Sequence, residues 1–242
     1  MARLARLYLP NQPQHVLLRT CDGATAFVDE ADRQRFLACL RQALKEDAKV
    51  ALHGYALLAD RVFWLGTPAD EAAMSRLVQG VGRRYVSYYN RRHGRSGRLW
   101  EARYRATVID AEQYLLLCTC CDETAAVAAG LANTPQDWRW SSYAHHVGLT
   151  VDPLVTDHAV YWALGNTPFE RQRAYRERCE QPVAPDQRLA LERATMSGWL
   201  LGGEAWLTRH ARQANRRALP LKRGRRAKEM TNSEPLSEAE ST

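Results

Sequence analysis

Residues 50–66 read VALHGYALLADRVFWLG and contain two apolar runs separated by the dipeptide Ala59-Asp60. Valine, tyrosine, phenylalanine and tryptophan favour β-strands, and a two-residue connection joins consecutive strands as an antiparallel pair. The segment therefore predicts a hairpin with strands over residues 50–58 and 61–66. Because the connection lacks the Asn-Gly pair that specifies a tight turn, the pattern does not define the register of the hairpin.

The chain before this hairpin predicts one strand and one helix. Residues 14–20, QHVLLRT, follow two prolines and have the composition of a strand. Asp29 or Asp32 is suited to cap a helix that extends to about Glu46. The apolar residues of this helix recur at helical spacing and predict one buried face: Phe36, Leu37, Leu40, Ala43 and Leu44.

The chain after the hairpin predicts a helix, a strand and a second helix. Thr67-Pro68 is a favoured helix start, and apolar residues at helical spacing follow it. A basic loop, NRRHGRSGR, then leads to a fourth strand over residues 103–109. Asp110 is suited to cap the next helix, which we expect to run to about Ala129 and to stop at Gly130.

This order of elements, strand–helix–strand–strand–helix–strand–helix, predicts an α+β fold. We expect a ferredoxin-like sandwich with an antiparallel sheet and helices on one face. The domain that carries the sheet covers residues 1–150, and a helical extension covers residues 151–215, with a break at Pro182 and Pro185. Residues 216–242 are expected to form a disordered tail that is first basic and then acidic.

The composition favours a polyanionic partner. The 242 residues include 34 lysines and arginines against 27 aspartates and glutamates, a formal net charge of +7. Clustered basic residues are typical of proteins that bind nucleic acids. The six cysteines form no pair of Cys-x-x-Cys motifs, which indicates reduced thiols in a cytoplasmic protein. No apolar run has the length of a signal peptide or of a membrane span.

An ordered set of segments covers most of the chain: MARLARLYLP (1–10), HGYALLADRVFWL (53–65), YVSYYNRRHGR (85–95), GRLWEARYRATVIDAEQYLLL (97–117), AGL (129–131), DWRWSSY (137–143), SGWLLGGEAWL (197–207) and KRGRRAK (222–228). This set resembles the REP-associated tyrosine transposases, a branch of the HUH-type single-strand DNA transposases. The resemblance implies that residues 1–150 are a transposase-like DNA-binding domain. It also implies a bacterial protein of the cytoplasm, associated with the nucleoid.

The activity of that family requires two elements at its reacting centre. A His-hydrophobic-His triplet on a strand directs two histidines to one side, where they bind Mg²⁺ or Mn²⁺, and a helix-borne tyrosine attacks DNA. By the resemblance, the triplet falls on Arg61, Val62 and Phe63, and the nucleophile falls on Cys121. The polar residue often found one turn after the tyrosine is Ala125. No His-x-His sequence occurs anywhere in the chain.

These replacements predict the loss of strand cleavage. Arginine stays protonated and does not ordinarily bind a divalent metal, and phenylalanine has no donor atom. We therefore expect no intact catalytic residue, no metal site and no cofactor. The leading hypothesis is a DNA-binding protein that recognises structured single-stranded DNA, such as a repeat hairpin, without cutting it. Two alternatives stay open: an active transposase or endonuclease that cuts and joins single-stranded DNA, and an RNA-binding regulator on the same fold.

Arginines concentrate between residues 83 and 105 around the glycine-containing loop, and aromatic residues interleave with them. Arginines neutralise phosphates, and aromatic faces stack on unpaired bases. The alternative is a helix with a charged outer face and with its tyrosines in the core. Together with cations of the tail, the expected DNA-binding residues are Arg83, Arg84, Arg91, Arg92, Arg95, Arg98, Arg103, Tyr104, Arg105, Lys222, Arg223, Arg225 and Arg226.

Other reactive side chains have simpler interpretations. Cys121 is either a substitute nucleophile or a thiol of the apolar core, and its helical stripe favours the core. His15 and His53 are single histidines on predicted strands, where structural hydrogen bonds are expected. His145-His146 is expected at the surface. Arg61 is either a phosphate contact or a solvated turn residue.

Overall fold

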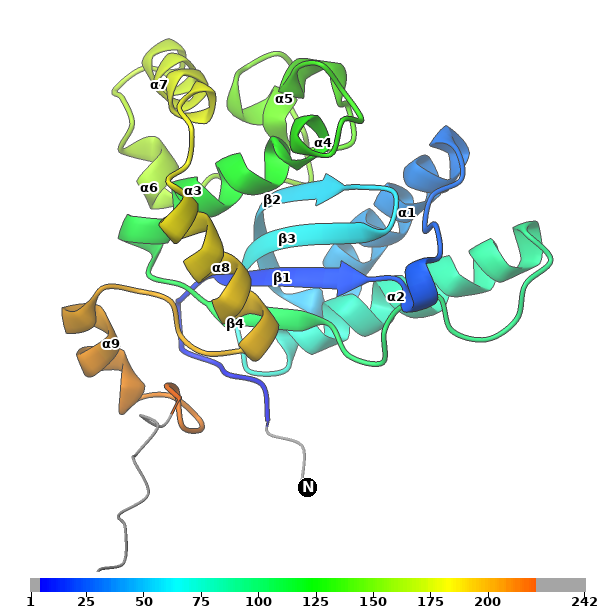
Figure 1. Ribbon diagram of the computed structural model, residues 1–242, viewed down its shortest axis with the longest axis horizontal. Helices are drawn as coiled ribbons and strands as arrows, with labels where there is room; N and C mark the ends of the chain where they lie inside the picture. Colours follow the sequence, from blue (N-terminus) through cyan, green and yellow to red (C-terminus); the bar gives the residue numbers. More distant parts are fainter. Residues whose placement is uncertain (1–4, 221–242) are drawn as a thin grey trace, which may run out of the picture.

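The computed structural model describes residues 5–220 of the chain. At its centre lies a four-stranded antiparallel sheet in the order β2-β3-β1-β4 (Figure 1). Its strands are β1 (Gln14–Arg19), β2 (Val50–Leu57), β3 (Arg61–Pro68) and β4 (Arg105–Val108). The predicted α+β, ferredoxin-like fold is confirmed.

The predicted hairpin is formed by β2 and β3. Leu57 pairs with Val62, and the backbone N–H of Leu58 donates to the carbonyl of Arg61 at 2.9 Å. The strand β3 continues through Pro68, which pairs with Val50, so the expectation that Thr67-Pro68 starts a helix is wrong. A proline is tolerated at the end of a strand, where the ladder no longer needs its missing N–H. The helix begins five residues later, at Ala73.

One face of the sheet is covered by α1 (Glu30–Ala43) and α2 (Ala73–Arg92). Asp29 caps α1, and its side chain accepts a hydrogen bond from the backbone N–H of Asp32. The core on this side combines the expected apolar face of α1 with residues of the strands and of α2, including Val16, Phe36, Trp64 and Tyr85. The sheet and these two helices together form the predicted ferredoxin-like sandwich.

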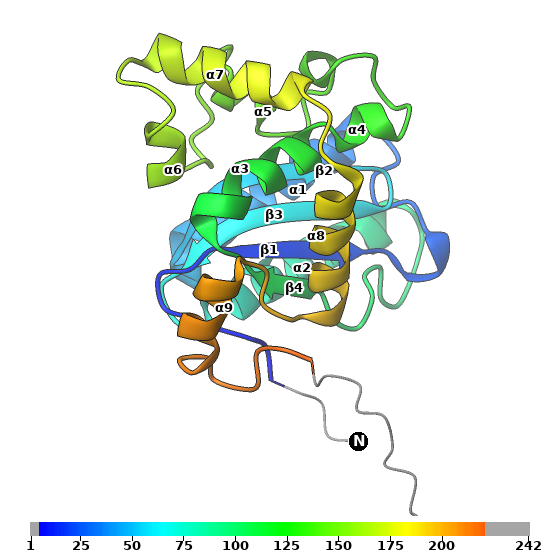
Figure 2. The same ribbon diagram turned by 60° about the vertical axis from the view of Figure 1, so that its left-hand side comes forward.

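The opposite face of the sheet is covered as well, by α3 (Ala111–Glu123) and α8 (Pro185–Ser197), as Figure 2 shows. Leu191 and Ala194 of α8 share an apolar cluster with Leu65 of β3 and Ile109, which follows β4. A helix that the sequence places in the extension therefore belongs to the core around the sheet. The division at residue 150 stays a prediction.

The helix that starts after Asp110 is shorter than expected, because it breaks at Thr124. The hydroxyl of Thr124 donates to the carbonyl of Cys120 at 2.6 Å, a side-chain bond that competes with the helical backbone. A single turn, α4 (Ala125–Ala128), follows the break. Gly130 then ends it with a positive φ of 69°.

A buried carboxylate joins α3 to the later helices. Glu123 accepts hydrogen bonds from Ser142 at 2.5 Å and from Tyr175 at 2.6 Å, and it lies 2.7 Å from Nδ1 of His146. His146 is buried, so the expectation of a surface histidine is wrong for this residue. Burial opposes protonation of His146, but the charge and the hydrogen bond of Glu123 outweigh it and raise the pKa. The helices joined here to α3 are α5 (Tyr143–His146) and α7 (Pro168–Glu180).

Short helices complete the described part of the chain: η1 (Cys21–Gly23), η2 (Leu44–Ala48), η3 (Pro135–Asp137), α6 (Ala159–Trp162) and α9 (Glu204–Ala211). The chain breaks between α7 and α8 as expected: Pro182 lies in the interval, and Pro185 is the first residue of α8. After α9, Ala218 is buried and its carbonyl accepts a hydrogen bond from Leu200. The tail cations Lys222, Arg223, Arg225 and Arg226 lie outside the described residues. No helix between residues 5 and 220 has the length and apolar character needed to cross a bilayer.

Candidate functional site

A cavity of about 270 Å³ lies between the sheet, α3 and α8. We call it the β1–β3 cavity, because residues of these two strands form its floor. Side chains two residues apart on a strand point to the same face. His15, Leu17 and Arg19 of β1 thus line the cavity together with Arg61 and Phe63 of β3. Its helical walls are Cys121, Asp122, Ala125, Arg188, Leu191, Glu192, Thr195 and Met196.

The structure brings together the three positions that the sequence singled out. Arg61, Phe63 and Cys121 all line the β1–β3 cavity, although about sixty residues separate the strand from the helix. Ala125, expected one turn after Cys121, also lines it. Arg61 donates two hydrogen bonds to the carboxylate of Asp60, each 2.8 Å long. This ion pair raises the pKa of Arg61, so the guanidinium that lines the cavity is charged and is neutralised by Asp60.

Phe63 does not leave an open ligand position. Its ring stacks on that of His15, with 5.9 Å between the ring centroids and an angle of 16° between the planes. Such a pair stabilises an apolar contact inside the cavity. The strand position that would hold a second histidine in the resembling family is therefore filled by a packed aromatic ring.

His15 links the sheet to both covering helices. Its Nδ1 lies 2.8 Å from Oγ1 of Thr195 on α8, and its Nε2 lies 3.1 Å from Oδ1 of Asp122 on α3. This supports the expected hydrogen-bonding role of His15. Sequence reasoning missed Asp122 and Thr195, and no local signal points to them, because they lie 107 and 180 residues from His15.

Asp122 is almost fully buried, with 4% of its surface exposed. Burial raises the pKa of its carboxyl, while the nearby His15 opposes that change. The oxygen Oδ2 has no hydrogen-bond partner among the described residues. A buried acid with one free oxygen is costly unless it is protonated or meets a further donor.

Cys121 lies at the edge of the apolar cluster and not inside it, so the expected core position needs correction. One side packs against the cluster, and the other side lines the β1–β3 cavity. Burial and the neighbouring Asp122 raise the pKa of the thiol to about 12. The thiol is therefore protonated at neutral pH, whereas a nucleophilic cysteine requires the thiolate.

The residues of the β1–β3 cavity do not fit a divalent metal. Arg61 and Phe63 supply no ligand, and His15 and Asp122 are hydrogen-bonded to each other. Within residues 5–220, no group of three or more histidine, cysteine, aspartate or glutamate side chains is arranged to hold a metal ion. This holds also for the cysteines around residue 120.

His53 has a structural environment. Its Nδ1 lies 2.7 Å from the carbonyl of Thr156, and its Nε2 lies 2.8 Å from Oγ1 of Thr67. Burial lowers the pKa of His53 to about 4. The histidine is therefore neutral at physiological pH and links the backbone of Thr156 to β2 and β3.

The arginines between residues 83 and 98 fall into two groups. Arg84 pairs with Glu46, and Arg92 pairs with Asp29 and Asp32, so both support the fold. The other group is exposed and has no ion pair within the described part of the chain: Arg83, Arg91, Arg95 and Arg98. Tyr85 and Tyr89 are buried and donate to backbone carbonyls, so the alternative of core tyrosines is correct for them.

Three further expected DNA-binding residues lie elsewhere, at the edge strand β4. Arg103 and Tyr104 precede β4, and Arg105 is its first residue. The hydroxyl of Tyr104 lies 3.0 Å from that of Ser75, and the guanidinium of Arg6 covers the ring at 3.5 Å. Tyr104 therefore positions an arginine, and one face of its ring is not open to a base.

No protein-family model and no curated protein matches the chain. Among solved structures, a REP-associated tyrosine transposase bound to a REP hairpin superposes with a TM-score of 0.53 at 13% identity, over 66% of this chain and 93% of that chain. A putative transposase from Deinococcus radiodurans gives a TM-score of 0.35 at 19% identity, over 48% and 92% of the two chains. The first of these likenesses shows the fold, and the chain has the fold of a tyrosine transposase.

Proposed function

We propose that this protein binds structured single-stranded DNA, such as a repeat hairpin, and does not cleave it. The observation that carries the proposal is the convergence of Arg61, Phe63 and Cys121 on one cavity of a transposase-like fold. These side chains lack the two functions that strand cleavage by this route requires, metal ligation and a phenolic nucleophile.

The chemistry of the cavity supports the loss of cleavage. The guanidinium of Arg61 is held by Asp60 and has no lone pair to offer a divalent metal, and the packed ring of Phe63 occupies the neighbouring position. The raised pKa of Cys121 keeps its sulfur in the unreactive thiol form. Changes at three separate positions all act against the same reaction.

The binding of DNA is supported by charge and by the structural neighbour. The chain carries a net charge of +7, and the arginines at 83, 91, 95 and 98 are exposed without ion pairs among the described residues. The superposed transposase is bound to a REP hairpin. A cytoplasmic location with access to the nucleoid is part of the proposal.

Fluorescence anisotropy with a panel of labelled oligonucleotides tests this function. The panel contains a DNA hairpin with a single-stranded flank, its duplex and single-stranded counterparts, and the same hairpin as RNA. We expect the DNA hairpin to bind most tightly and its affinity to fall steeply with salt. Stronger binding of the RNA hairpin would favour the RNA-binding alternative. Equal binding of all four would show that the protein binds nucleic acids by nonspecific electrostatic attraction and does not recognise the hairpin.

A further inference from the structure

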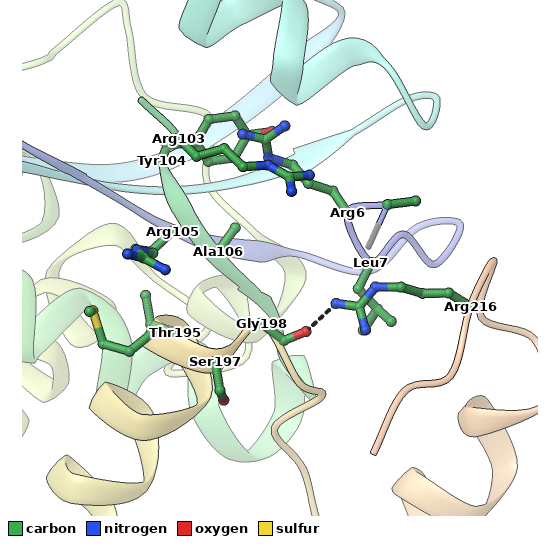
Figure 3. A pocket seen from close by; sticks show the side chains of 12 residues that line it. Arg6, Leu7, Arg103, Tyr104, Arg105, Ala106, Thr195, Ser197, Gly198 and Arg216 are labelled. Carbon is green, nitrogen blue, oxygen red and sulfur yellow. Dashed lines mark hydrogen bonds between the residues drawn. The ribbon is translucent and has the colours of Figure 1, made fainter. Parts of the chain in front are cut away.

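Four arginines surround a second pocket, at the edge of the sheet beside β4 (Figure 3). This pocket has a volume of about 140 Å³, and we call it the arginine pocket. Its arginines are Arg6, Arg103, Arg105 and Arg216. Among residues 5–220, none that lines it is an aspartate or a glutamate. The sequence pointed to two of these arginines and missed Arg6 and Arg216, which lie near the two ends of the chain.

Specific contacts hold two of these guanidinium groups in place. Arg6 lies over the ring of Tyr104 at 3.5 Å. Arg216 donates to the carbonyl of Gly198 at 2.6 Å (Figure 3). It also donates to the carbonyl of Arg217 at 2.8 Å. Preorganised arginines lose less freedom when they bind an anion than freely moving ones do.

When no anion is bound, the environment of the pocket disfavours the charged form of two of its arginines. Burial lowers the pKa of Arg6, and the nearby Arg103 lowers it further. The pKa of Arg216 is lowered by burial and then by Arg103 and Arg217. Nε of Arg216 is buried without a hydrogen-bond partner in the described residues. An anion in the pocket would relieve the repulsion between these arginines.

The arginine pocket adjoins the β1–β3 cavity. Thr195 and Met196 line both. A further depression shares Arg6 and Arg103 with the arginine pocket, and it shares Arg19 with the β1–β3 cavity. A chain of phosphates spaced along a nucleic-acid strand would match a row of basic sites of this kind.

We propose that the arginine pocket binds a backbone phosphate of a single DNA strand that passes across the β1–β3 cavity. This inference rests on the proposed function and extends it, because it assigns a phosphate site to residues other than the exposed arginines between 83 and 98. The negative phosphate oxygens accept hydrogen bonds from the guanidinium groups, and the strand supplies the charge that the pocket lacks.

The test compares the DNA affinity of the double variant Arg6→Gln/Arg105→Gln with that of the wild type over a range of salt concentrations. Arg105→Gln alone is a second test variant, because this exposed side chain makes only a loose 3.8 Å contact with Glu101. The control is Arg173→Gln/Arg178→Gln on α7, which removes the same charge at the opposite end of the molecule (Figure 1).

We expect the double variant to bind the DNA hairpin about tenfold more weakly than the wild type. The slope of log affinity against log salt should become shallower by about 0.7 to 0.9, the contribution of one lost phosphate contact. Arg105→Gln alone should show a smaller loss of affinity and a smaller change of slope in the same direction. The α7 control should keep the wild-type slope.

The outcomes separate the two proposals. If the wild type binds DNA and both test variants match the α7 control in affinity and slope, the phosphate site is refuted and the proposed function stands. If the wild type binds no oligonucleotide, the proposed function fails and the assignment to DNA fails with it. Inorganic phosphate then serves as a probe: a rise in Tm lost in Arg105→Gln would reassign the pocket to a small phosphate compound.

Discussion

The reactivity of Cys121 gives a quantitative test of the altered reacting centre. Alkylation with iodoacetamide proceeds through the thiolate, so its rate depends on the pKa of the thiol. The structure raises that pKa from 9.0 to about 12. At pH 7.5 this difference of three pH units lowers the thiolate fraction about a thousandfold. The greater basicity of such a thiolate recovers part of the rate, since nucleophilicity rises with a Brønsted slope of about 0.4 to 0.5.

The net expectation is alkylation of Cys121 about 30 to 60 times slower than that of an unstructured cysteine peptide. Mass spectrometry of the tryptic fragment that contains Cys121 resolves the modified residue, and a Cys121→Ala variant confirms the assignment. Between pH 7 and 10 the rate should rise about tenfold per pH unit, whereas the peptide should level off near its lower pKa. A purely steric block would slow alkylation at every pH, but the pH profile of Cys121 would then level off at the same pH as that of the peptide. If Cys121 reacts as fast as the peptide at pH 7.5, the inference of an inert thiol is refuted.

Three further predictions concern the tail, the buried histidine and the buried carboxylate. Ending the chain at Pro220 removes Lys222, Arg223, Arg225, Arg226 and Lys228, and should weaken DNA binding without changing Tm, as anisotropy and thermal unfolding would show. The pKa of His53 is lowered to about 4, so the folded state disfavours its protonated form. The free energy of unfolding should fall by about 3 kcal/mol as pH drops from 6.5 through 4, and His53→Gln should flatten this dependence in urea titrations. Tyr175→Phe removes a hydrogen bond to the buried Glu123 and should cost about 1 to 3 kcal/mol, whereas Tyr8→Phe at the surface should cost less than 1 kcal/mol.

The elements that were predictable from sequence are those fixed by local patterns. The apolar runs of residues 50–66, the cap at Asp29 and the cap at Asp110 each act within a few residues, and the structure confirms them. Thr67-Pro68 misled the prediction, because the pairing of Pro68 with Val50 outweighed its local preference for a helix start. The burial of His146 depends on Glu123, 23 residues away, and no pattern near His146 indicates it.

In the candidate site and the arginine pocket, some residues were identified from the sequence, and others are revealed only by the packing of distant elements. Arg61, Phe63 and Cys121 were found through a resemblance, which assigns residues that are far apart in the chain to one site. Asp122 and Thr195 meet His15 only through the packing of α3 and α8 on the sheet, so no spacing in the sequence reveals them. Arg6 and Arg216 join the arginine pocket from opposite ends of the chain for the same reason.

The central claim, binding of DNA without cleavage, is tested most directly by incubating a labelled DNA hairpin with the protein and Mg²⁺ or Mn²⁺. A native gel measures binding, and a denaturing gel of the same samples detects cut strands and covalent protein–DNA adducts. We predict a shifted complex on the native gel and, on the denaturing gel, only intact, free hairpin. A metal-dependent adduct would contradict this account. Its loss in Cys121→Ala would make Cys121 the nucleophile, and its persistence there would place the reaction at a residue outside the β1–β3 cavity positions identified from the sequence.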